Sequence, residues 1–237
     1  MDKISAYKDR ALASLKGKWK DVVITTLVFV TIGAVLSLSL TLPFVLNKVE
    51  NSVVNFVSIL LFPFGWGYMV YFLNFVRGKY QLTDIFDGYT KNYFVRTMLT
   101  ILLFAILIFI GSILLIVPGI IMACMFSQVY FIMKDDESIG YWKALSKSMD
   151  MMKGHKMQYF LLYLSFIGWV LLALLIFMVI TWFMLTDEAL WGLGLPTLLA
   201  LGIFLMWLIP YMYTTFAHYY EDVKAEYEAK NAVITEA

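Results

Sequence analysis

Long apolar runs alternate with short charged segments along the whole chain. Each run is long enough to cross the hydrocarbon layer of a membrane, which requires about 20 residues of α-helix. The runs cover residues 22–46, 53–76, 98–133, 159–185 and 195–220. None of these runs contains an aspartate, glutamate, lysine or arginine. The pattern therefore predicts an all-α, polytopic membrane protein.

The third run is too long for one span. As a single helix, residues 98–133 would measure about 54 Å at about 1.5 Å per residue, whereas the hydrocarbon core is about 30 Å thick. Pro118 and Gly119 lie near its middle, where proline removes a backbone donor and glycine permits a left-handed turn. We therefore predict two helices, 98–117 and 120–133, that meet at this pair. The second is short, so we expect it to be tilted or packed against protein.

Basic residues are divided unequally between the segments that connect the spans. With six spans, every lysine and arginine except Lys48 falls on one side of the membrane. A five-span arrangement would place the lysines of 134–156 on the other side and remove this asymmetry. The positive-inside rule then predicts that both termini are cytoplasmic. The expected outer loops are short and cover 47–52, 118–119 and 186–194.

Two charged segments, 3–20 and 138–153, carry apolar residues at helical spacing. These residues are Ile4, Ala11, Leu12, Leu15 and Trp19 in the first segment, and Ile139, Trp142, Leu145, Met149 and Met152 in the second. One interpretation is an amphipathic helix at the membrane interface, and the other is a helix packed on a soluble core. Because the composition suggests no such core, we favour the interface. A weaker pattern at 81–89 predicts a short helix capped by Thr83.

The six spans would pair into three hairpins, each preceded by a cytoplasmic segment. The sequences that lead into the first and fifth spans are alike, LKGKWK at 15–20 and MKGHKM at 152–157. A threefold internal repeat is one explanation. The other is that every cytoplasmic membrane boundary collects lysine and aromatic residues. The sequence leaves both explanations open.

Composition narrows the class of protein further. Hydrophobic residues make up 62% of the chain and charged residues 15%, against about half and a quarter in soluble domains. The net charge of +1 implies no bulk affinity for nucleic acid. Cys124 is the single cysteine and lies in an apolar run, so no disulfide framework is expected. The first span is longer than a signal-peptide core, so we expect it to be retained.

Candidate chemistry is scarce inside the predicted spans. An ionisable residue within a membrane is costly and usually functional, but none lies in the middle of any span. The sequence also lacks HExxH and a phosphate-binding glycine loop. These absences disfavour intramembrane proteolysis, nucleotide hydrolysis and proton-coupled transport. We therefore expect no catalytic residue, no metal and no cofactor.

The first candidate site is the segment that contains Lys153, His155 and Lys156. These residues stand where lipid headgroups lie, at the start of a span whose free amides attract anions. Lys16 and Lys18 occupy the corresponding positions before the first span. A metal site would need more ligands than the two histidines of the chain provide. We favour a membrane boundary at which the basic residues contact anionic headgroups.

The second candidate site is FPFGWG, in the middle of the second predicted span. Pro63, Gly65 and Gly67 predict that this span is kinked or locally unwound. One interpretation is close helix packing through the glycines. The other is a ligand cavity, to which Pro118 and Gly119 of the third run would contribute.

Several short motifs resemble one family of bacterial membrane proteins. They are IVPGII at 116–121, MKGHK at 152–156, LSFIGW at 164–169 and PYMYTTFAHYY at 210–220. In their order and spacing they resemble the family catalogued as domain of unknown function 975, found mainly in Gram-positive bacteria. The resemblance implies a multi-pass protein of the cytoplasmic membrane without an assigned activity. A fainter similarity links the chain to the membrane domain of some glycerophosphodiester phosphodiesterases, whose hydrolase domain has no counterpart here.

These observations lead to three hypotheses for function. The first is a non-enzymatic membrane protein that binds anionic lipid, a membrane-protein partner or a second copy through its basic cytoplasmic belt. The alternative is a transport component or small-molecule permease with a cavity near 63–67 and 118–119. A lipid-modifying enzyme ranks last. Membrane lipids are the expected partners in every case, and nucleic acid is not.

Overall fold

The computed structural model describes residues 4–46, 61–90, 93–114, 116–186 and 194–236. These residues form helices and connecting turns, with no strand among them, so the all-α class is confirmed. The helices are α1 (Ile4–Leu15), α2 (Trp19–Leu46), α4 (Phe62–Val76), the 3₁₀ helix η2 (Leu82–Tyr89), α5 (Phe94–Leu114), α6 (Ile116–Phe126), α7 (Val129–Asp135), α8 (Tyr141–Met151), α9 (Lys156–Thr186) and α10 (Gly194–Glu236).

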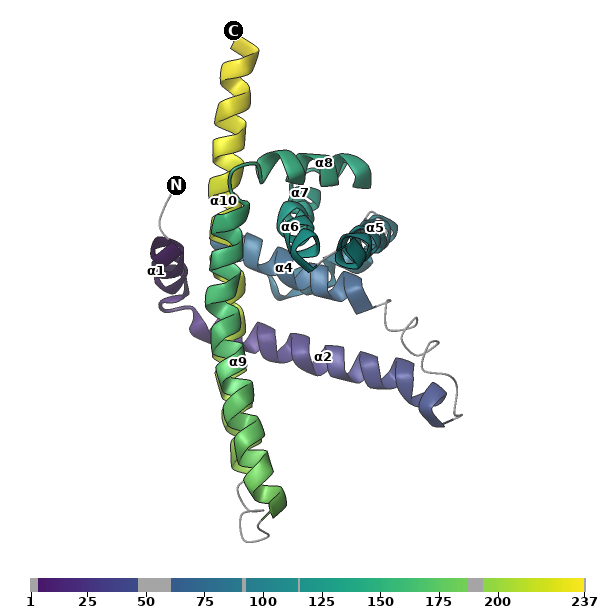
Figure 1. Cartoon of the computed structure of the whole chain (residues 1–237), viewed down its shortest axis with the longest axis vertical. Helices are drawn as coiled ribbons and strands as arrows, with labels where there is room; N and C mark the ends of the chain where they lie inside the picture. The colour runs from purple at the N-terminus through teal and green to yellow at the C-terminus, as the bar shows by residue number, and fades with distance from the viewer. Residues whose placement is uncertain (1–3, 47–60, 91–92, 115, 187–193, 237) are drawn as a thin grey trace.

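Two long helices dominate the shape of the molecule. α9 and α10 run antiparallel along the longest axis, with α1 beside them and α4 to α8 gathered on the other side (Figure 1). α2 leaves this pair at a steep angle and projects away from it (Figure 1).

Four helical stretches are long and apolar enough to cross a membrane, and they are compatible with a membrane-embedded protein. They cover Trp19–Pro43, Val117–Asp135, Lys156–Met184 and Gly194–Ala232. A fifth is obtained if the bent pair Leu82–Tyr89 and Phe94–Leu107, which meet at 75°, counts as one span. The arrangement of six spans in three hairpins stays a prediction.

The described part of the third apolar run holds three helices, α5, α6 and α7, and Pro118 and Gly119 do not separate any of them. A turn at Ser127 and Gln128 interrupts the predicted helix 120–133 instead. α5 ends at Leu114 and α6 begins at Ile116. Pro118 and Gly119 therefore lie in the first turn of α6, and the turn predicted at this pair is wrong. Proline is tolerated in a first turn because the backbone donor it lacks has no partner inside the helix there.

The second predicted span is helical from Phe62 onward, and its earlier part lies among residues 47–60, which are outside the described chain. Pro63 stands in the first turn of α4, and the helix then continues without a break through Gly65 and Gly67. The predicted unwinding at these residues is therefore wrong. The proline starts the helix here instead of interrupting it.

The apolar faces of α1 and α8 are buried against protein, not exposed to a membrane interface. Tyr7, Ala11 and Leu15 of α1 are fully buried, as are Ala144 and Leu145 of α8. They belong to one continuous core with aromatic residues of α4, α7 and α10. The interfacial interpretation assumed that no protein core was available to these helices. Aromatic residues of α4, α7 and α10 form such a core. Among the predicted interfacial residues, Leu12 of α1 and Trp142 of α8 are exposed, at 38% and 64%.

The helix η2 packs on α4 through glycines on both elements. A Cβ atom at Gly67 would lie 2.2 Å from the carbonyl oxygen of Ile85, and one at Gly88 would lie 2.0 Å from that of Pro63. Side chains larger than hydrogen would therefore separate the two helices. This contact is the close packing that the sequence offered as the alternative to a cavity at 63–67.

The cap of η2 differs from the predicted one. The Asp84 carboxylate accepts hydrogen bonds from the backbone N–H of Gln81 at 3.0 Å and from the Asn74 side chain at 2.9 Å. Gln81 is the N-cap residue and forms a capping box with Asp84. The prediction of Thr83 as the cap is therefore wrong, although the short helix itself is present.

Candidate functional site

The three glycines with left-handed backbone in the described chain are all flanked by basic residues. They are Gly17, Gly78 and Gly154, with φ angles of 79°, 72° and 87°. Each follows a helix, and left-handed glycine is a common helix terminator. The flanking residues are Lys16 and Lys18, Arg77 and Lys79, and Lys153 and His155. We call these three segments the glycine turns.

Sequence reasoning found the first and third glycine turns but missed the second. Its signal was the tetrapeptide RGKY at 77–80, which repeats the basic–glycine–basic order. It was hidden because this turn follows a predicted span, whereas the other two precede one. All three serve the same local purpose, which is to end a helix and leave exposed basic side chains at the reversal.

The turns at Gly17 and Gly78 lie side by side. The Lys18 ammonium stands 5.4 Å from the ring centre of Phe75 and 5.7 Å from that of Tyr80. The Tyr80 hydroxyl in turn donates a hydrogen bond of 3.1 Å to the Asp21 carboxylate. Two segments that are far apart in the sequence therefore form one surface. We call its exposed lysines the turn lysines; they are Lys16, Lys18, Lys20 and Lys79.

The turn at Gly154 is tied to α10. Lys153 is exposed, and its ion pair within the described chain is with Asp150 in the last turn of α8, at 2.7 Å. The His155 ring faces Glu226 at 3.2 Å, and its carbonyl accepts a hydrogen bond of 2.9 Å from the Tyr219 hydroxyl. With its side chain only 13% exposed, His155 positions the turn on α10 more than it faces solvent.

Lys156 completes the predicted headgroup residues. It is partly buried at the start of α9 and makes no ion pair with a described residue. The structure therefore separates the predicted set into two places, with Lys16 and Lys18 at one and the residues around Gly154 at the other. Within the described chain, no three His, Cys, Asp or Glu residues lie close enough to share a metal ion.

Residues 218–226 of α10 hold α1 in place. Arg10 donates two hydrogen bonds to the Asp222 carboxylate, at 3.0 and 2.6 Å. Ser14 and the His218 ring are joined by a hydrogen bond of 2.9 Å. The helix that precedes the first glycine turn is thus fixed to the last helix of the chain by polar contacts as well as by its buried face.

The same stretch of α10 joins α4 and α7 through one carboxylate. Asp135 accepts hydrogen bonds from Arg77 at 2.6 and 3.1 Å, from the Tyr220 hydroxyl at 2.6 Å and from Lys224 at 2.6 Å. Arg77 also donates to Glu221 at 2.7 Å. Burial opposes the positive charge of Arg77, but the hydrogen bonds and charges of Asp135 and Glu221 outweigh it and raise its pKa.

These contacts divide the charged side chains into those that form ion pairs and those that do not. The acidic side chains Asp135, Glu221 and Asp222 are paired with Arg77, Lys224 and Arg10 inside the bundle. Asp87 is likewise paired with Lys134 at 2.7 Å. The turn lysines have no ion-pair partner in the described chain. Their positive charge is therefore accessible to an anionic ligand from outside the protein.

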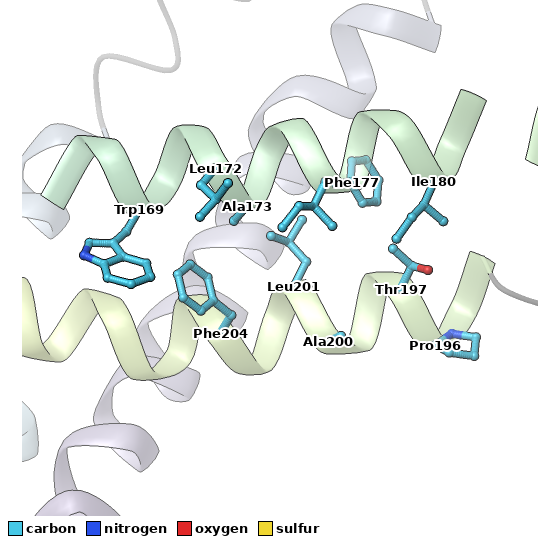
Figure 2. Close-up of a pocket in the computed structure, with 11 residues that line it drawn as sticks. Trp169, Leu172, Ala173, Phe177, Ile180, Pro196, Thr197, Ala200, Leu201 and Phe204 are labelled. Atoms are coloured by element: carbon cyan, nitrogen blue, oxygen red, sulfur yellow. The ribbon is translucent and has the colours of Figure 1, made fainter. Parts of the chain in front are cut away.

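An apolar groove of about 470 Å³ lies between α9 and α10. Figure 2 shows its side chains facing one another from the two helices, with Trp169 and Phe204 towards one end and Thr197 and Pro196 towards the other. Apart from Thr197, every lining residue is apolar. A site that orients a polar substrate needs several convergent polar groups, so this groove suits hydrocarbon and not polar chemistry.

The residues predicted to form a cavity are placed differently. The space beside Gly67 is filled by the backbone of η2. By contrast, a Cβ atom added at Gly65 would have no neighbouring atom within 4 Å. None of Pro63, Gly65, Gly67, Pro118 and Gly119 lines any of the four clearest pockets of the described chain. A permease cavity at these residues stays a prediction.

Comparison with known proteins gives a family but no activity. Residues 112–227 match the family described as "Protein of unknown function (DUF975)". The chain matches no curated protein and no solved structure. The matched region contains Asp135, the turn at Gly154 and most of α10, but not the turns at Gly17 and Gly78.

Proposed function

Since residues 112–227 belong to the DUF975 family, whose function is unknown, we propose a function from the geometry of the chain itself. The protein is a non-enzymatic membrane protein that binds anionic phospholipid headgroups through its glycine turns. The proposal rests on the division between paired and unpaired charged side chains. Asp87, Asp135, Glu221 and Asp222 are held in ion pairs within the bundle, whereas the turn lysines are exposed and have no ion-pair partner among the described residues.

The position of these lysines suits a membrane surface. Gly17 comes directly before α2, and Gly154 directly before α9, two of the helices that are apolar enough to cross a membrane. The start of a helix also presents unpaired backbone N–H groups, which favour phosphate. Each lysine near an anionic membrane surface contributes about 1 kcal/mol to binding.

The proposal places the molecule in a bacterial cytoplasmic membrane with both termini inside. The positive-inside rule supports this orientation, because the glycine turns carry many of the basic residues. The turn lysines would then meet the inner leaflet, where anionic lipids create a negative surface potential. The apolar groove between α9 and α10 would face hydrocarbon chains.

The test is the lipid preference of the full chain in vesicles that contain anionic and zwitterionic lipids. We expect anionic lipid to be enriched around the wild-type protein and this enrichment to fall in the double variant Lys16→Ala/Lys18→Ala. The matched control is Lys143→Ala/Lys230→Ala, which removes two exposed lysines outside the glycine turns. Equal effects of both double variants would show that only total charge matters. An unchanged preference in the first variant would refute the proposal.

A further inference from the structure

A small pocket, mostly apolar in its lining but with several polar side chains, opens beside the glycine turns at Gly17 and Gly78. It measures about 210 Å³ and lies between the start of α2, the middle of α4 and the start of η2. Its lining residues are Asp21, Ile24, Thr25, Tyr71, Tyr80, Gln81 and Leu82. The pocket is unlike the groove between α9 and α10, because it brings together a carboxylate, two phenols, a hydroxyl and an amide.

Several of these polar groups have capacity for a ligand. The Asp21 carboxylate accepts one hydrogen bond, from Tyr80, and a carboxylate has about four acceptor positions. The Tyr71 side chain is 1% exposed. Its hydroxyl lies beside Thr25 but makes no hydrogen bond of normal geometry to a described residue. Protein atoms cover this hydroxyl. Because an unpaired buried hydroxyl is unfavourable, a ligand that displaces this cover and pairs with Tyr71 would be stabilised.

The surrounding charges select the kind of ligand. Lys18 lies over the ring of the lining residue Tyr80, and Lys20 and Lys79 are sequence neighbours of Asp21 and Tyr80. Asp21 is the only acidic residue among those that line the pocket, and the nearby Asp84 carboxylate already accepts hydrogen bonds from Gln81 and Asn74. The local balance is positive, which favours an anion. The Lys18 ammonium already lies over the Tyr80 ring, so a second ammonium group would be repelled there. The Asp21 carboxylate and the phenols of Tyr71 and Tyr80 would then form hydrogen bonds with hydroxyl groups of the ligand.

The rim of the pocket is apolar. Ile24 and Leu82 are each 45% exposed and border the polar lining. A soluble phosphate ester gains nothing from such a rim. A phospholipid does, because its glycerol ester and the first carbons of its acyl chains leave the headgroup on that side. The combination of a mostly apolar lining, a few polar side chains and neighbouring lysines matches an amphiphile.

We propose that this pocket binds the hydroxylated headgroup of an anionic phospholipid, of which phosphatidylglycerol is the simplest form. The phosphate lies against the turn lysines, and the headgroup hydroxyls form hydrogen bonds with Asp21, Tyr71 and Gln81. This inference rests on the proposed function and specifies which anionic lipid is preferred. A pocket of about 210 Å³ accommodates a glycerol group.

The experiment uses the full chain in nanodiscs that contain equal amounts of phosphatidylglycerol, phosphatidic acid, phosphatidylserine and phosphatidylethanolamine. Lipids that remain bound are counted by native mass spectrometry. We expect phosphatidylglycerol to be enriched over the other two anionic lipids by at least roughly fivefold, the factor for one net hydrogen bond. Tyr71→Phe, which removes one of the three proposed partners, should lower this ratio by about the same factor. Tyr141→Phe, an exposed hydroxyl elsewhere, should not change it.

The outcomes separate this inference from the proposed function. If the wild type prefers all anionic lipids equally, the pocket assignment is overturned and the proposed function stands. If no anionic preference exists, both fail. Enrichment of phosphatidylserine or phosphatidylethanolamine would show that the pocket binds ammonium groups and would overturn the inference. Displacement of phosphatidylglycerol by an equal concentration of glycerol 1-phosphate would identify a soluble ester as the ligand. If Tyr71→Phe fails to fold, Gln81→Ala tests the same site.

Discussion

The Arg77 guanidinium and the Asp135 carboxylate face each other through two hydrogen bonds, of 2.6 and 3.1 Å, across the ends of α4 and α7. Tyr220 and Lys224 of α10 bind the same carboxylate. Three helices therefore meet at one side chain that is only 11% exposed. This contact fixes the position of the second glycine turn relative to α10, because Arg77 is the residue that precedes Gly78.

Asp135→Ala should destabilise the protein by about 3 kcal/mol or more, the usual result when one partner of a buried ion pair is removed. Arg77 and Lys224 would be left without their shared acceptor. The measurement is thermal unfolding in detergent micelles, followed by helical circular dichroism. Asp150→Ala is the control, because its pair with Lys153 is exposed and such pairs contribute about 1 kcal/mol at most. Similar losses in both variants would contradict this account of the cluster.

Gly67→Ala should separate η2 from α4. The added methyl group would lie 2.2 Å from the Ile85 carbonyl oxygen, a backbone atom that cannot move without displacing η2. We expect a loss of at least about 2 kcal/mol, which is typical of overpacking. Gly65→Ala is the control on the same helix, because nothing lies within 4 Å of its added atom. There alanine should be neutral or stabilise by up to about 1 kcal/mol. The measurement is the unfolding midpoint of each variant, and equal midpoints would contradict the close packing of η2 on α4.

Gly154→Ala tests a different requirement, the left-handed backbone. Nothing lies near an added Cβ atom at Gly154, but its φ angle is 87°. Alanine in that region costs about 1–2 kcal/mol, so the unfolding midpoint should fall. Gly154→Asn should lose less, because asparagine tolerates this conformation. Gly168→Ala is the control inside α9, where the backbone is helical. Equal stability of the alanine and asparagine variants would mean that the turn relaxes.

The long helices were predictable because an uninterrupted apolar run has one physical explanation at such lengths. α2 and α9 begin within three residues of the predicted spans, and α10 begins at Gly194, one residue early. The helix ends at Gly17 and Gly154 were also readable, because lysine and glycine mark a helix terminus beside a membrane. Each of these signals is local, because all the residues that produce it lie in one short segment of the sequence.

The protein core and the ion pairs were not predictable, because they depend on residues far apart in the sequence. Arg77 meets Glu221 across 144 positions. The aromatic residues toward the ends of the second and sixth predicted spans were interpreted as a membrane boundary, yet Tyr71 and Tyr220 are buried in the bundle. An aromatic residue at a helix end has the same sequence signal in both settings. Only the packing distinguishes them, and it also buries the faces of α1 and α8.

Membrane orientation can be tested with single cysteines. In a Cys124→Ala background, we expect Lys16→Cys and Lys153→Cys to react with a membrane-impermeant maleimide only after the cells are opened. Glu188→Cys, in the predicted outer loop, should react in intact cells. Cys124 itself is buried, so its replacement should leave the fold intact. Reaction of Lys16→Cys and Glu188→Cys from the same side would refute the predicted orientation.

Salt should separate the two sets of charges. The turn lysines are exposed, and at about 0.5 M salt exposed charges are screened beyond a few ångströms, compared with about 10 Å at 0.1 M. The preference for anionic lipid should therefore fall steeply between these concentrations. The Asp135 cluster is largely shielded from solvent, so the unfolding midpoint should change little over the same range. A lipid preference that persists at high salt would mean that hydrogen bonds, and not the charge of the turn lysines, dominate binding. A parallel loss of stability would show that the cluster is open to solvent.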